Sequence, residues 1–352
     1  MVIGQDIIAT KVASYLGERA GEGLFFLIDR KVGDLHEARL SPLFVLSTPA
    51  RCFFIEGGEE HKTLTTLEQI WHWLLSSGAN RRSLLVVIGG GVLTDIGGFA
   101  AATYMRGIRS IHIPTTLLGM VDASVGGKTG IDFAGIKNII GAFHEPEEVF
   151  IDTDWLYTLP LSELYSGYAE IIKTALLDGP ELWRRVLRLD DPQSLISEEW
   201  IELIGKAVAY KERIVRADLR EGGLRRVLNL GHTVGHALEA FSHRATPENP
   251  LLHGEAVIIG LIVEGYLAVT RLGAERTMLS QLYALARELY SPYHYTCKSY
   301  EELWQLMQYD KKNDGSVLCI VPLAPGQISE LRLKSVEEIK EALDFYRESF
   351  GN

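Results

Sequence analysis

The chain has 352 residues and carries 35 Lys and Arg against 46 Asp and Glu, a net charge of −11 at pH 7. Hydrophobic residues make up 47% and charged residues 23%, a balance typical of a globular protein, and it excludes a disordered one. The acidic balance also excludes a nucleic-acid scaffold. A small anionic substrate is not excluded, because it needs only a local cluster of basic side chains. The length indicates two domains or one large one.

The cysteines and the apolar runs indicate a cytoplasmic protein. Cys52, Cys297 and Cys319 are odd in number and widely spaced, so neither a disulfide framework nor a thiolate zinc site is expected. Asp6 and Lys11 precede any long apolar run, which argues against a signal peptide. The apolar run 256–263 is far shorter than the ~20 residues that a membrane-spanning helix needs. We therefore expect no membrane partner.

The first half of the chain alternates short apolar runs with amphipathic stretches. The predicted buried strands are residues 24–29, 43–47, 84–88 and 111–114, and the predicted helices between them include 66–76 and 95–103. Strands that alternate with helices indicate a parallel sheet covered by helices. We therefore expect residues 1–159 to form an α/β domain.

The segment LLVVIGGGVLTDIGGFAA, residues 84–101, predicts a strand, a glycine turn and a helix. Glycine lacks a Cβ atom, so backbone N–H groups at Gly89, Gly90 and Gly91 can approach a phosphate, and a helix N-terminus also attracts anions. The pattern is not a complete G-x-G-x-x-G, because Thr94 holds the sixth position, and a plain tight turn remains the alternative. Asp29 ends the first strand, where it can bind a ribose diol or serve as a turn or cap residue.

A second glycine-rich segment carries lysines. Residues 126–138 include Gly126, Gly127, Lys128, Gly130, Lys137 and Asn138, with Asp122 just upstream. The segment is not a Walker loop, because Asp122 stands where that motif requires its first glycine. Lysines held by glycine turns suit phosphate or carboxylate binding, and the alternative is that they are solvated loop lysines.

After Pro160 the pattern becomes helical. The predicted helices are residues 162–177, 198–219, 231–242, 255–272, 275–290 and 336–349, with one strand-like run at 317–321. We therefore expect a mostly helical second domain over residues 160–352.

The helical half contains candidate metal ligands. His232 and His236 are four residues apart on one predicted helix face, and His253 opens another helix. Thr233 replaces the glutamate of H-E-x-x-H, which argues against a zinc protease. Glu170 and Lys173, three residues apart, offer an acid and a base on one face. The three histidines with a carboxylate predict a zinc site, but the spacing leaves open which three residues bind and whether one histidine is a cap or core residue.

Together these motifs resemble the 3-dehydroquinate synthase family of sugar phosphate cyclases. The resemblance covers most of the chain, and the segments that carry it are GGGVLTDIGGF, YMRG, IPTTLLGMVDASVGGKTGID, GIKNIIGAF, AEIIKTA, REGGLRRVLNLGHTVGHALEA and LLHGEAV, in family order. It implies a dinucleotide-binding (Rossmann-like) α/β domain, an all-helical metal-binding domain and a homodimer.

The resemblance also assigns roles by position. The implied Zn²⁺ or Co²⁺ ligands are Glu170, His232 and His253, which leaves His236 either to contact the substrate or to support a metal ligand. The implied NAD-binding residues are Asp29, Glu59, Lys62, Gly90, Gly91, Asp95, Thr115, Thr116, Asp122, Lys128 and Lys137. The implied substrate-binding and catalytic residues are Lys128, Lys137, Asn138, Lys173, Lys211, Arg225, Asn229 and His236, with either Lys311 or Lys312. Arg106 is implied to reach the phosphate in the other subunit's site.

The implied reaction converts 3-deoxy-D-arabino-heptulosonate 7-phosphate to 3-dehydroquinate and phosphate, a step of the shikimate pathway to chorismate and the aromatic amino acids. NAD transiently oxidises a ring hydroxyl, phosphate leaves by β-elimination, the hydride returns, and an intramolecular aldol closes the carbocycle. Two departures from the family pattern affect no implied ligand or basic contact: D-E-x-E reads Asp218, Leu219, Arg220 and Glu221, and Tyr168 replaces a frequent methionine.

Three alternatives remain open. Another sugar phosphate cyclase would act on neutral sugar phosphates, yet Lys211, Arg225 and Asn229 suit a carboxylate. A metal-dependent polyol dehydrogenase gives no reason for the Lys128, Lys137 and Asn138 cluster. A non-catalytic NAD sensor would tolerate the loss of ligands, and none is lost.

Overall fold

The computed structural model describes residues 1–189, 191–219, 222–309 and 315–350. The chain divides into two compact units. The first contains Met1–Pro160 and Ile196–Val208, and the second contains Leu161–Leu195 and Ala209–Asn352. Among the described residues, no helix is both long and apolar enough to cross a membrane.

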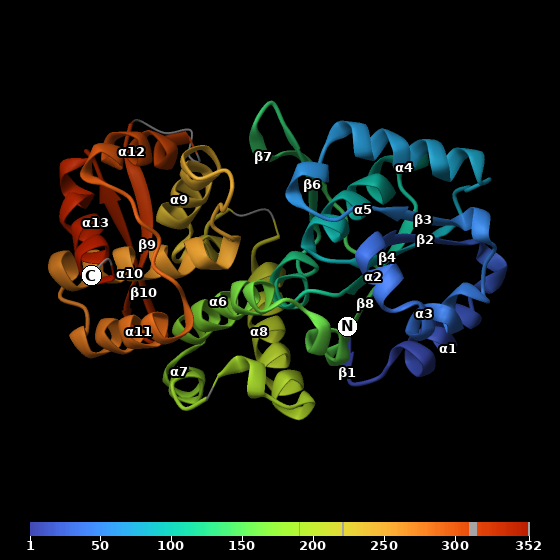
Figure 1. Ribbon diagram of the computed structural model, residues 1–352, viewed down its shortest axis with the longest axis horizontal. Helices are drawn as coiled ribbons and strands as arrows, with labels where there is room; N and C mark the ends of the chain where they lie inside the picture. The colour runs from blue at the N-terminus through green and yellow to red at the C-terminus, as the bar shows by residue number, and fades with distance from the viewer. Residues whose placement is uncertain (190, 220–221, 310–314, 351–352) are drawn as a thin grey trace. The chain divides into compact units, whose positions relative to one another are not determined.

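A six-stranded sheet forms the centre of the first unit (Figure 1). Its order is β1 (Val2–Gly4), β8 (Glu148–Asp152), β5 (Arg109–Pro114), β4 (Leu84–Gly89), β2 (Leu24–Asp29) and β3 (Cys52–Ile55). Every neighbouring pair is parallel, which confirms the expected parallel sheet. Strands covered on both faces are apolar along their whole length, and β4 is buried at every residue.

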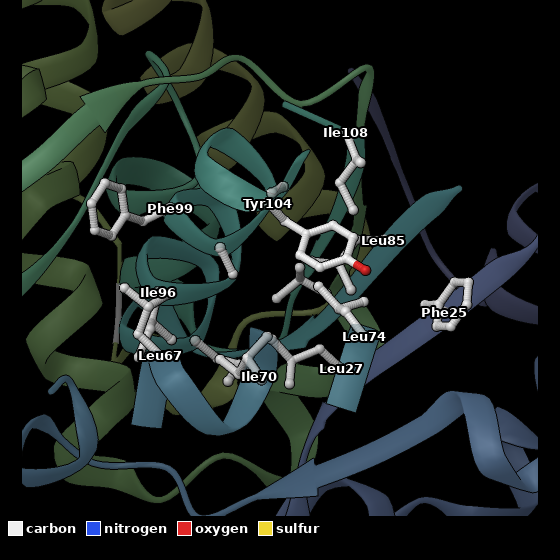
Figure 2. Close-up of a cluster of buried hydrophobic side chains, with 14 of the residues drawn as sticks. Phe25, Leu27, Leu67, Ile70, Leu74, Leu85, Ile96, Phe99, Tyr104 and Ile108 are labelled. Atoms are coloured by element: carbon white, nitrogen blue, oxygen red, sulfur yellow. The ribbon is translucent and has the colours of Figure 1, made fainter. Parts of the chain in front are cut away.

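The amphipathic helix α4 (Leu64–Ser76) and the largely buried helix α5 (Gly91–Thr103) cover one face of this sheet. Leu67, Ile70 and Leu74 of α4 pack with Ile96 and Phe99 of α5 in one hydrophobic core (Figure 2). The remaining helices of this part are α1 (Ala13–Gly17), α2 (Arg30–Leu35), α3 (Glu37–Phe44) and single turns at Ile8–Val12, Ala20–Glu22, Pro49–Arg51, Glu59–His61, Tyr104–Arg106, Gly119–Ala123 and Thr153–Thr158. The core thus holds the ends of β2 and β4 in fixed positions.

The predicted strand at residues 43–47 is wrong. Residues 43 and 44 belong to α3, in which Leu40 and Leu43 are buried. The strand of this region is β3, which begins at Cys52. A short apolar run is ambiguous, because a buried helix turn and a buried strand share the same composition.

The lysine-bearing glycine segment forms an antiparallel hairpin of β6 (Lys128–Phe133) and β7 (Ile136–Phe143) rather than a loop. Gly130 faces Gly141 across the hairpin. A Cβ atom on Gly141 would lie 2.1 Å from the carbonyl oxygen of Thr129, so the two strands can approach only without a side chain there.

The second unit is rich in helices but is not all-helical, which corrects the expectation from the family resemblance. Its helices are α6 (Leu161–Asp178), α7 (Pro180–Val186), α9 (His232–Ala245), α10 (His253–Leu272), α11 (Arg276–Leu289), α12 (Tyr300–Tyr309) and α13 (Glu337–Phe350), with short turns at Pro192–Ser194, Leu224–Asn229 and Cys297–Ser299. Helix α8 (Ser197–Ala217) contributes to both units. An antiparallel pair, β9 (Val317–Ala324) and β10 (Gln327–Leu333), includes the strand-like run predicted at 317–321.

Glycines allow α9 and α10 to approach each other closely. A Cβ atom on Gly260 would lie 1.9 Å from the carbonyl oxygen of Gly231, and one on Gly235 would lie 3.0 Å from that of Ala256. Gly231 also has φ +77°, in the left-handed region that favours glycine. This approach brings together the first residues of both helices, His232 and His253.

Candidate active site

The carboxyl ends of β2 and β4 place two predicted cofactor segments side by side. Ile28 of β2 pairs with Ile88 of β4, so Asp29 lies next to the glycine turn at Gly89–Gly91. From these adjacent strands the chain continues outward in opposite directions, to β3 on one side and to β5 on the other. In open parallel sheets, ligands bind outside the carboxyl ends of strands at such a reversal.

Close packing explains the glycines of this turn. Gly90 precedes α5 and Gly91 begins it. A Cβ atom on Gly90 would lie 3.0 Å from Cγ2 of Thr116, and one on Gly91 would lie 3.0 Å from Cβ of Ala123. The segment after β5 therefore lies against the turn, where the N-terminus of α5 can attract an anion. This segment contains three of the predicted NAD-binding residues, Thr115, Thr116 and Asp122.

Asp29 has a structural role in the described contacts. One of its carboxylate oxygens accepts a hydrogen bond from the backbone N–H of Val32 at 3.2 Å and caps α2. Burial raises the pKa of Asp29, and the backbone hydrogen bonds act in the opposite direction. Asp29 is therefore a helix cap, one of the two roles that the sequence left open for it, and ribose binding stays a prediction.

Lys62 connects the predicted cofactor residues to the hairpin. Its side chain is buried, and its Nζ donates to Oδ2 of Asp95 at 2.6 Å and to Oδ1 of Asn138 at 2.5 Å. On the hairpin, Nζ of Lys137 lies 3.7 Å from Oε1 of Glu59. Burial raises the pKa of Asp95 to about 6, although the Lys62 ammonium opposes the shift. Lys62, Asp95 and Asn138, assigned separately by the resemblance, thus form one polar network, and Lys137 and Glu59 form an ion pair in the same unit.

Arg106 is exposed and lies in an unusual backbone conformation. Met105 has φ 51° and Arg106 has φ 68°, so two consecutive residues with side chains occupy the left-handed region. Such residues cost on the order of 1–3 kcal/mol each and often occur at functional sites. Lys128 is also exposed, at the start of β6. The substrate roles of both residues stay predictions.

In the second unit, one carboxylate oxygen and two imidazole nitrogens converge. Oε1 of Glu170 lies 3.4 Å from Nε2 of His232 and 3.5 Å from Nε2 of His253. Glu170 comes from the buried interior of α6, and each histidine is the first residue of its helix. The geometry therefore brings together the three residues that the family resemblance assigned as metal ligands.

A hydrogen bond at Nδ1 of His232 determines which ring nitrogen faces the cluster. Nδ1 of His232 lies 3.0 Å from the carbonyl oxygen of Leu230, which can only accept a hydrogen bond. Nδ1 of the neutral ring therefore carries the proton, and Nε2 presents its lone pair toward Glu170. Metal-binding histidines are commonly oriented by such a hydrogen bond from the second nitrogen.

The cluster has strongly perturbed electrostatics. Burial alone would raise the pKa of Glu170, but the Lys173 ammonium, 2.5 Å from its Oε2, and the histidines hold that pKa well below its usual range. Burial, followed by Lys173, lowers the pKa of His232 to about 3. Burial would also lower the pKa of His253, but its contacts with Glu170 and Glu239 raise it to about 10.

The residues present fit a divalent metal ion. Oε1 of Glu170 is buried and accepts no hydrogen bond from the described residues, which leaves a negative oxygen available at the centre of the cluster. Two imidazoles and one carboxylate form a ligand set used by catalytic zinc sites, which retain open positions for substrate. Lys173 occupies the other carboxylate oxygen and directs Oε1 toward the histidines.

His236 belongs to a second, overlapping group. His236, Glu239 and His253 also have ligand atoms within 4.8 Å of one another. The sequence-only interpretation had included His236 among the candidate ligands, and Glu239 was not predicted at all. Its position three residues after His236, on the same face of α9, is a signal that could have found it. Glu264 was missed as well: it is buried and accepts the backbone N–H groups of Gly231 and Val234 at the start of α9.

The predicted carboxylate-binding residues lie in the same unit. Arg225 and Asn229 are in the turn Leu224–Asn229, and Lys211 is in α8. Arg225 is only 2% exposed, and its Nη1 donates to the carbonyl oxygen of Leu219 at 3.1 Å. The assigned lysine pair, Lys311 and Lys312, and the departures Arg220 and Glu221 lie outside the described residues.

Comparison with known proteins agrees with this geometry. Residues 52–166 match the family model of the 3-dehydroquinate synthase N-terminal domain, and residues 167–313 match that of the C-terminal domain. The 3-dehydroquinate synthase of Parabacteroides distasonis is 41% identical over 100% of this chain and 98% of the relative. That of Pyrococcus furiosus is 42% identical over 82% of this chain and 84% of the relative.

A related cyclase shares the whole fold. The structure of 2-epi-5-epi-valiolone synthase from Streptomyces hygroscopicus, with NAD⁺ and Zn²⁺ bound, is similar with a TM-score of 0.85 and 27% identity, covering 99% of this chain and 96% of that chain. With matching family models from residue 52 to residue 313 and a relative that is 41% identical over its full length, this chain belongs to the 3-dehydroquinate synthase family.

Proposed function

We propose that this chain converts 3-deoxy-D-arabino-heptulosonate 7-phosphate to 3-dehydroquinate and phosphate in the shikimate pathway. The observation that carries the proposal is the buried cluster of Glu170, His232 and His253, with Lys173 on the outer carboxylate oxygen. Curated relatives with this activity, over 40% identical across most of the chain, support the assignment. The cytoplasm is the proposed location.

The cluster is proposed to hold Zn²⁺, or Co²⁺ in its place. When bound, such an ion supplies a Lewis acid for substrate hydroxyls, and NAD supplies a transient hydride acceptor. Glu170 contributes the anionic oxygen, and His232 contributes a lone pair fixed by its bond to Leu230. Lys173 offsets the buried carboxylate charge and provides an ammonium beside the substrate hydroxyls.

NAD is proposed to bind at the carboxyl ends of β2 and β4, on the set assigned by the resemblance. The pyrophosphate would lie on the glycine turn before α5, and Asp29 would face the ribose. The Lys62 network supports this proposal, because it presents buried charges of both signs next to the turn. The related cyclase with NAD⁺ and Zn²⁺ bound supports the same pair of cofactors.

The basic residues are proposed to bind the two anionic ends of the substrate. Lys211, Arg225 and Asn229 would contact the carboxylate, and Lys128, Lys137, Asn138 and His236 would hold the rest of the molecule. Charge-assisted hydrogen bonds from fixed donors hold a reacting molecule in one orientation and stabilise the charge that develops on the departing phosphate.

A homodimer is proposed, with Arg106 reaching the phosphate in the partner's site. The hairpin β6–β7 supports dimer formation because Phe133, Ile136, Ile139, Ile140 and Phe143 are between 38% and 60% exposed. Contiguous exposed apolar side chains on a strand pair typically mark a protein interface. The exposed, strained position of Arg106 in the same unit agrees with a role outside its own subunit.

Purified protein with the heptulosonate phosphate, Zn²⁺ and catalytic NAD tests the proposal. We expect phosphate and 3-dehydroquinate in equal amounts, and loss of both in Glu170→Gln. A parallel reaction with a sugar phosphate that lacks the carboxylate tests the related cyclase activity, which the fold alone permits. Turnover of only that neutral substrate, or stoichiometric accumulation of reduced nicotinamide without phosphate release, would contradict the proposal.

A further inference from the structure

His253 lies between two carboxylates, one on each ring nitrogen. Its Nε2 lies 3.5 Å from Oε1 of Glu170, and its Nδ1 lies 3.4 Å from Oε2 of Glu239. Both carboxylates are at least nine-tenths buried. The same ring therefore belongs to both possible metal-ligand groups. Without a metal ion the two carboxylates favour the doubly protonated ring, whereas a metal ion takes the lone pair of one nitrogen and leaves the single proton of the neutral ring on the other.

His232 decides which side of His253 faces the metal. Because Nδ1 of His232 donates to the Leu230 carbonyl, its Nε2 lone pair points to the Glu170 side. That side already offers a lone pair and a carboxylate oxygen without a hydrogen-bond donor among the described residues. A third ligand there requires the lone pair of His253 Nε2, which leaves the proton of the neutral ring on Nδ1.

A proton on Nδ1 in a buried position needs an acceptor, and Glu239 is placed to accept it. Glu239 lies on α9, two turns after His232, and its side chain is only 9% exposed. We propose that Glu239 is a positioning residue: its carboxylate accepts the Nδ1 proton of His253 and holds Nε2 toward Glu170 and His232. This inference rests on the proposed metal site and adds a residue that the family resemblance did not assign.

The expected loss of metal affinity in Glu239→Ala follows from how hydrogen bonds to the second nitrogen of a metal-binding histidine generally behave. Removing the acceptor behind a metal-binding histidine typically weakens metal affinity about 10- to 100-fold. The ion and its ligands remain, so one metal ion per chain should still bind at saturation. Glu239→Gln retains a carbonyl oxygen that can accept the same proton, and we expect it to restore most of the affinity lost in Glu239→Ala.

The test measures the Zn²⁺ dissociation constant of the full-length protein by chelator competition, for wild type, Glu239→Ala and Glu239→Gln. The visible spectrum of the Co²⁺-loaded proteins reports the ligand geometry. Tyr300→Phe is the matched control, because it removes a hydrogen bond to Asp344 in the same unit and touches no ligand. Urea unfolding of the metal-free proteins measures how much each variant destabilises the fold.

We expect weakened Zn²⁺ binding in Glu239→Ala, near-complete recovery in Glu239→Gln and an unchanged dissociation constant in Tyr300→Phe. If Glu239→Ala binds Zn²⁺ as wild type does and only loses stability, the positioning role is wrong. If Glu239→Gln loses the ion as fully as Glu239→Ala, Glu239 is itself a ligand and the inference fails. Wild type that binds no Zn²⁺ would overturn the metal site and this inference together. The expected affinities without cyclase activity would overturn only the proposed function.

Discussion

At the scale of single residues, chemistry in the second unit depends on which atom of each side chain faces inward. His232 shows this most clearly, since a backbone carbonyl on Nδ1 commits Nε2 to the cluster. Lys173 acts in the same way on Glu170, because it occupies one oxygen and leaves the other for the histidines. Arg225 is buried with one N–H committed to a carbonyl, so its orientation is also fixed by the protein.

Replacement of the two neighbouring histidines should have different consequences. His253→Ala removes a proposed ligand and should abolish both bound metal and activity, because the remaining pair cannot complete the site. His236→Ala should retain the metal and lose activity through its substrate contact. Elemental analysis of both purified variants checks this, and a metal-replete His253→Ala protein would contradict the ligand assignment.

Arg225 should discriminate in favour of a carboxylate substrate. A guanidinium binds a carboxylate through two parallel hydrogen bonds that an ammonium cannot reproduce. Arg225→Lys and Arg225→Ala should each lose on the order of 1.5–3 kcal/mol of transition-state stabilisation, about 10- to 150-fold in kcat/KM.

The control for Arg225 is a sugar phosphate without the carboxylate, whose kcat/KM should change little in both variants. Because Arg225 also bonds to Leu219, the thermal stability of each variant must be compared with wild type. Equal losses for both substrates would mean that Arg225 only maintains its loop.

At the scale of elements, the metal cluster depends on the close approach of α9 and α10. Both proposed histidine ligands are the first residues of these helices, so a small change in helix separation moves both imidazoles. Glu264 reinforces the contact, since its buried carboxylate on α10 accepts the first N–H groups of α9. A buried charge satisfied by a helix N-terminus is favourable there, because the helix dipole attracts it.

Gly260→Ala should separate these helices. The new methyl group would lie 1.9 Å from the Gly231 carbonyl oxygen, so one helix must shift, and overpacking of this kind costs typically 1–3 kcal/mol. We expect a lower urea midpoint and weaker Zn²⁺ binding. Gly205→Ala in α8 is the matched control: no atom lies within 4 Å of its Cβ position, and the change should stabilise the helix by roughly 0.5–1 kcal/mol. Normal metal binding by Gly260→Ala would show that helix separation does not position the ligands.

At the scale of the whole molecule, stability and turnover also depend on groups in the first unit. His112 is buried in β5, and neither ring nitrogen has a hydrogen-bond partner among the described residues. Burial, with a smaller contribution from His144, lowers the pKa of His112 to about 3. The folded protein therefore keeps this ring neutral at pH values where the unfolded chain protonates it.

Acid should destabilise the protein partly through His112. The depressed folded-state pKa means that stability is fully present above the unfolded value of 6.5 and is lost as pH falls toward about 3. Within that window the loss approaches about 1.4 kcal/mol per pH unit, because the unfolded state binds one more proton. Urea unfolding between these pH values should show a shallower dependence for His112→Phe than for wild type. Parallel curves would mean that His112 does not titrate on unfolding.

NAD should be recycled rather than consumed. A cyclisation without net redox change requires the cofactor to return its hydride in every cycle, so one equivalent of NAD per chain should support many turnovers. Phosphate release measured at limiting NAD checks this. Turnover that stops after one product per NAD would indicate a dehydrogenase instead.

Local sequence patterns predicted much of this molecule. Alternating apolar runs predicted the parallel sheet, because strands buried on both faces must be apolar and must alternate with covering helices. The glycine turn after β4 and the cluster of acid and histidine side chains indicated a cofactor and a metal site. The run at 43–47 was misassigned, and β3 was missed, because short apolar segments carry no period that separates a helix turn from a strand.

Tertiary contacts determined what spacing along the chain could not. Periodicity along α9 shows that His232 and His236 share a face. The ring nitrogen of His232 that points inward depends on the backbone conformation at Leu230, two residues earlier, which the spacing of side chains does not give. Glu239 and Glu264 gained their roles only when α10 packed against α9, since neither contact joins residues close in sequence. A side chain's type and spacing state what chemistry it can perform. Some partners that fix its protons and lone pairs are local, as Leu230 and Lys173 are, but the cluster forms only where α6, α9 and α10 bring Glu170, His232 and His253 together, so its arrangement was determined by the fold.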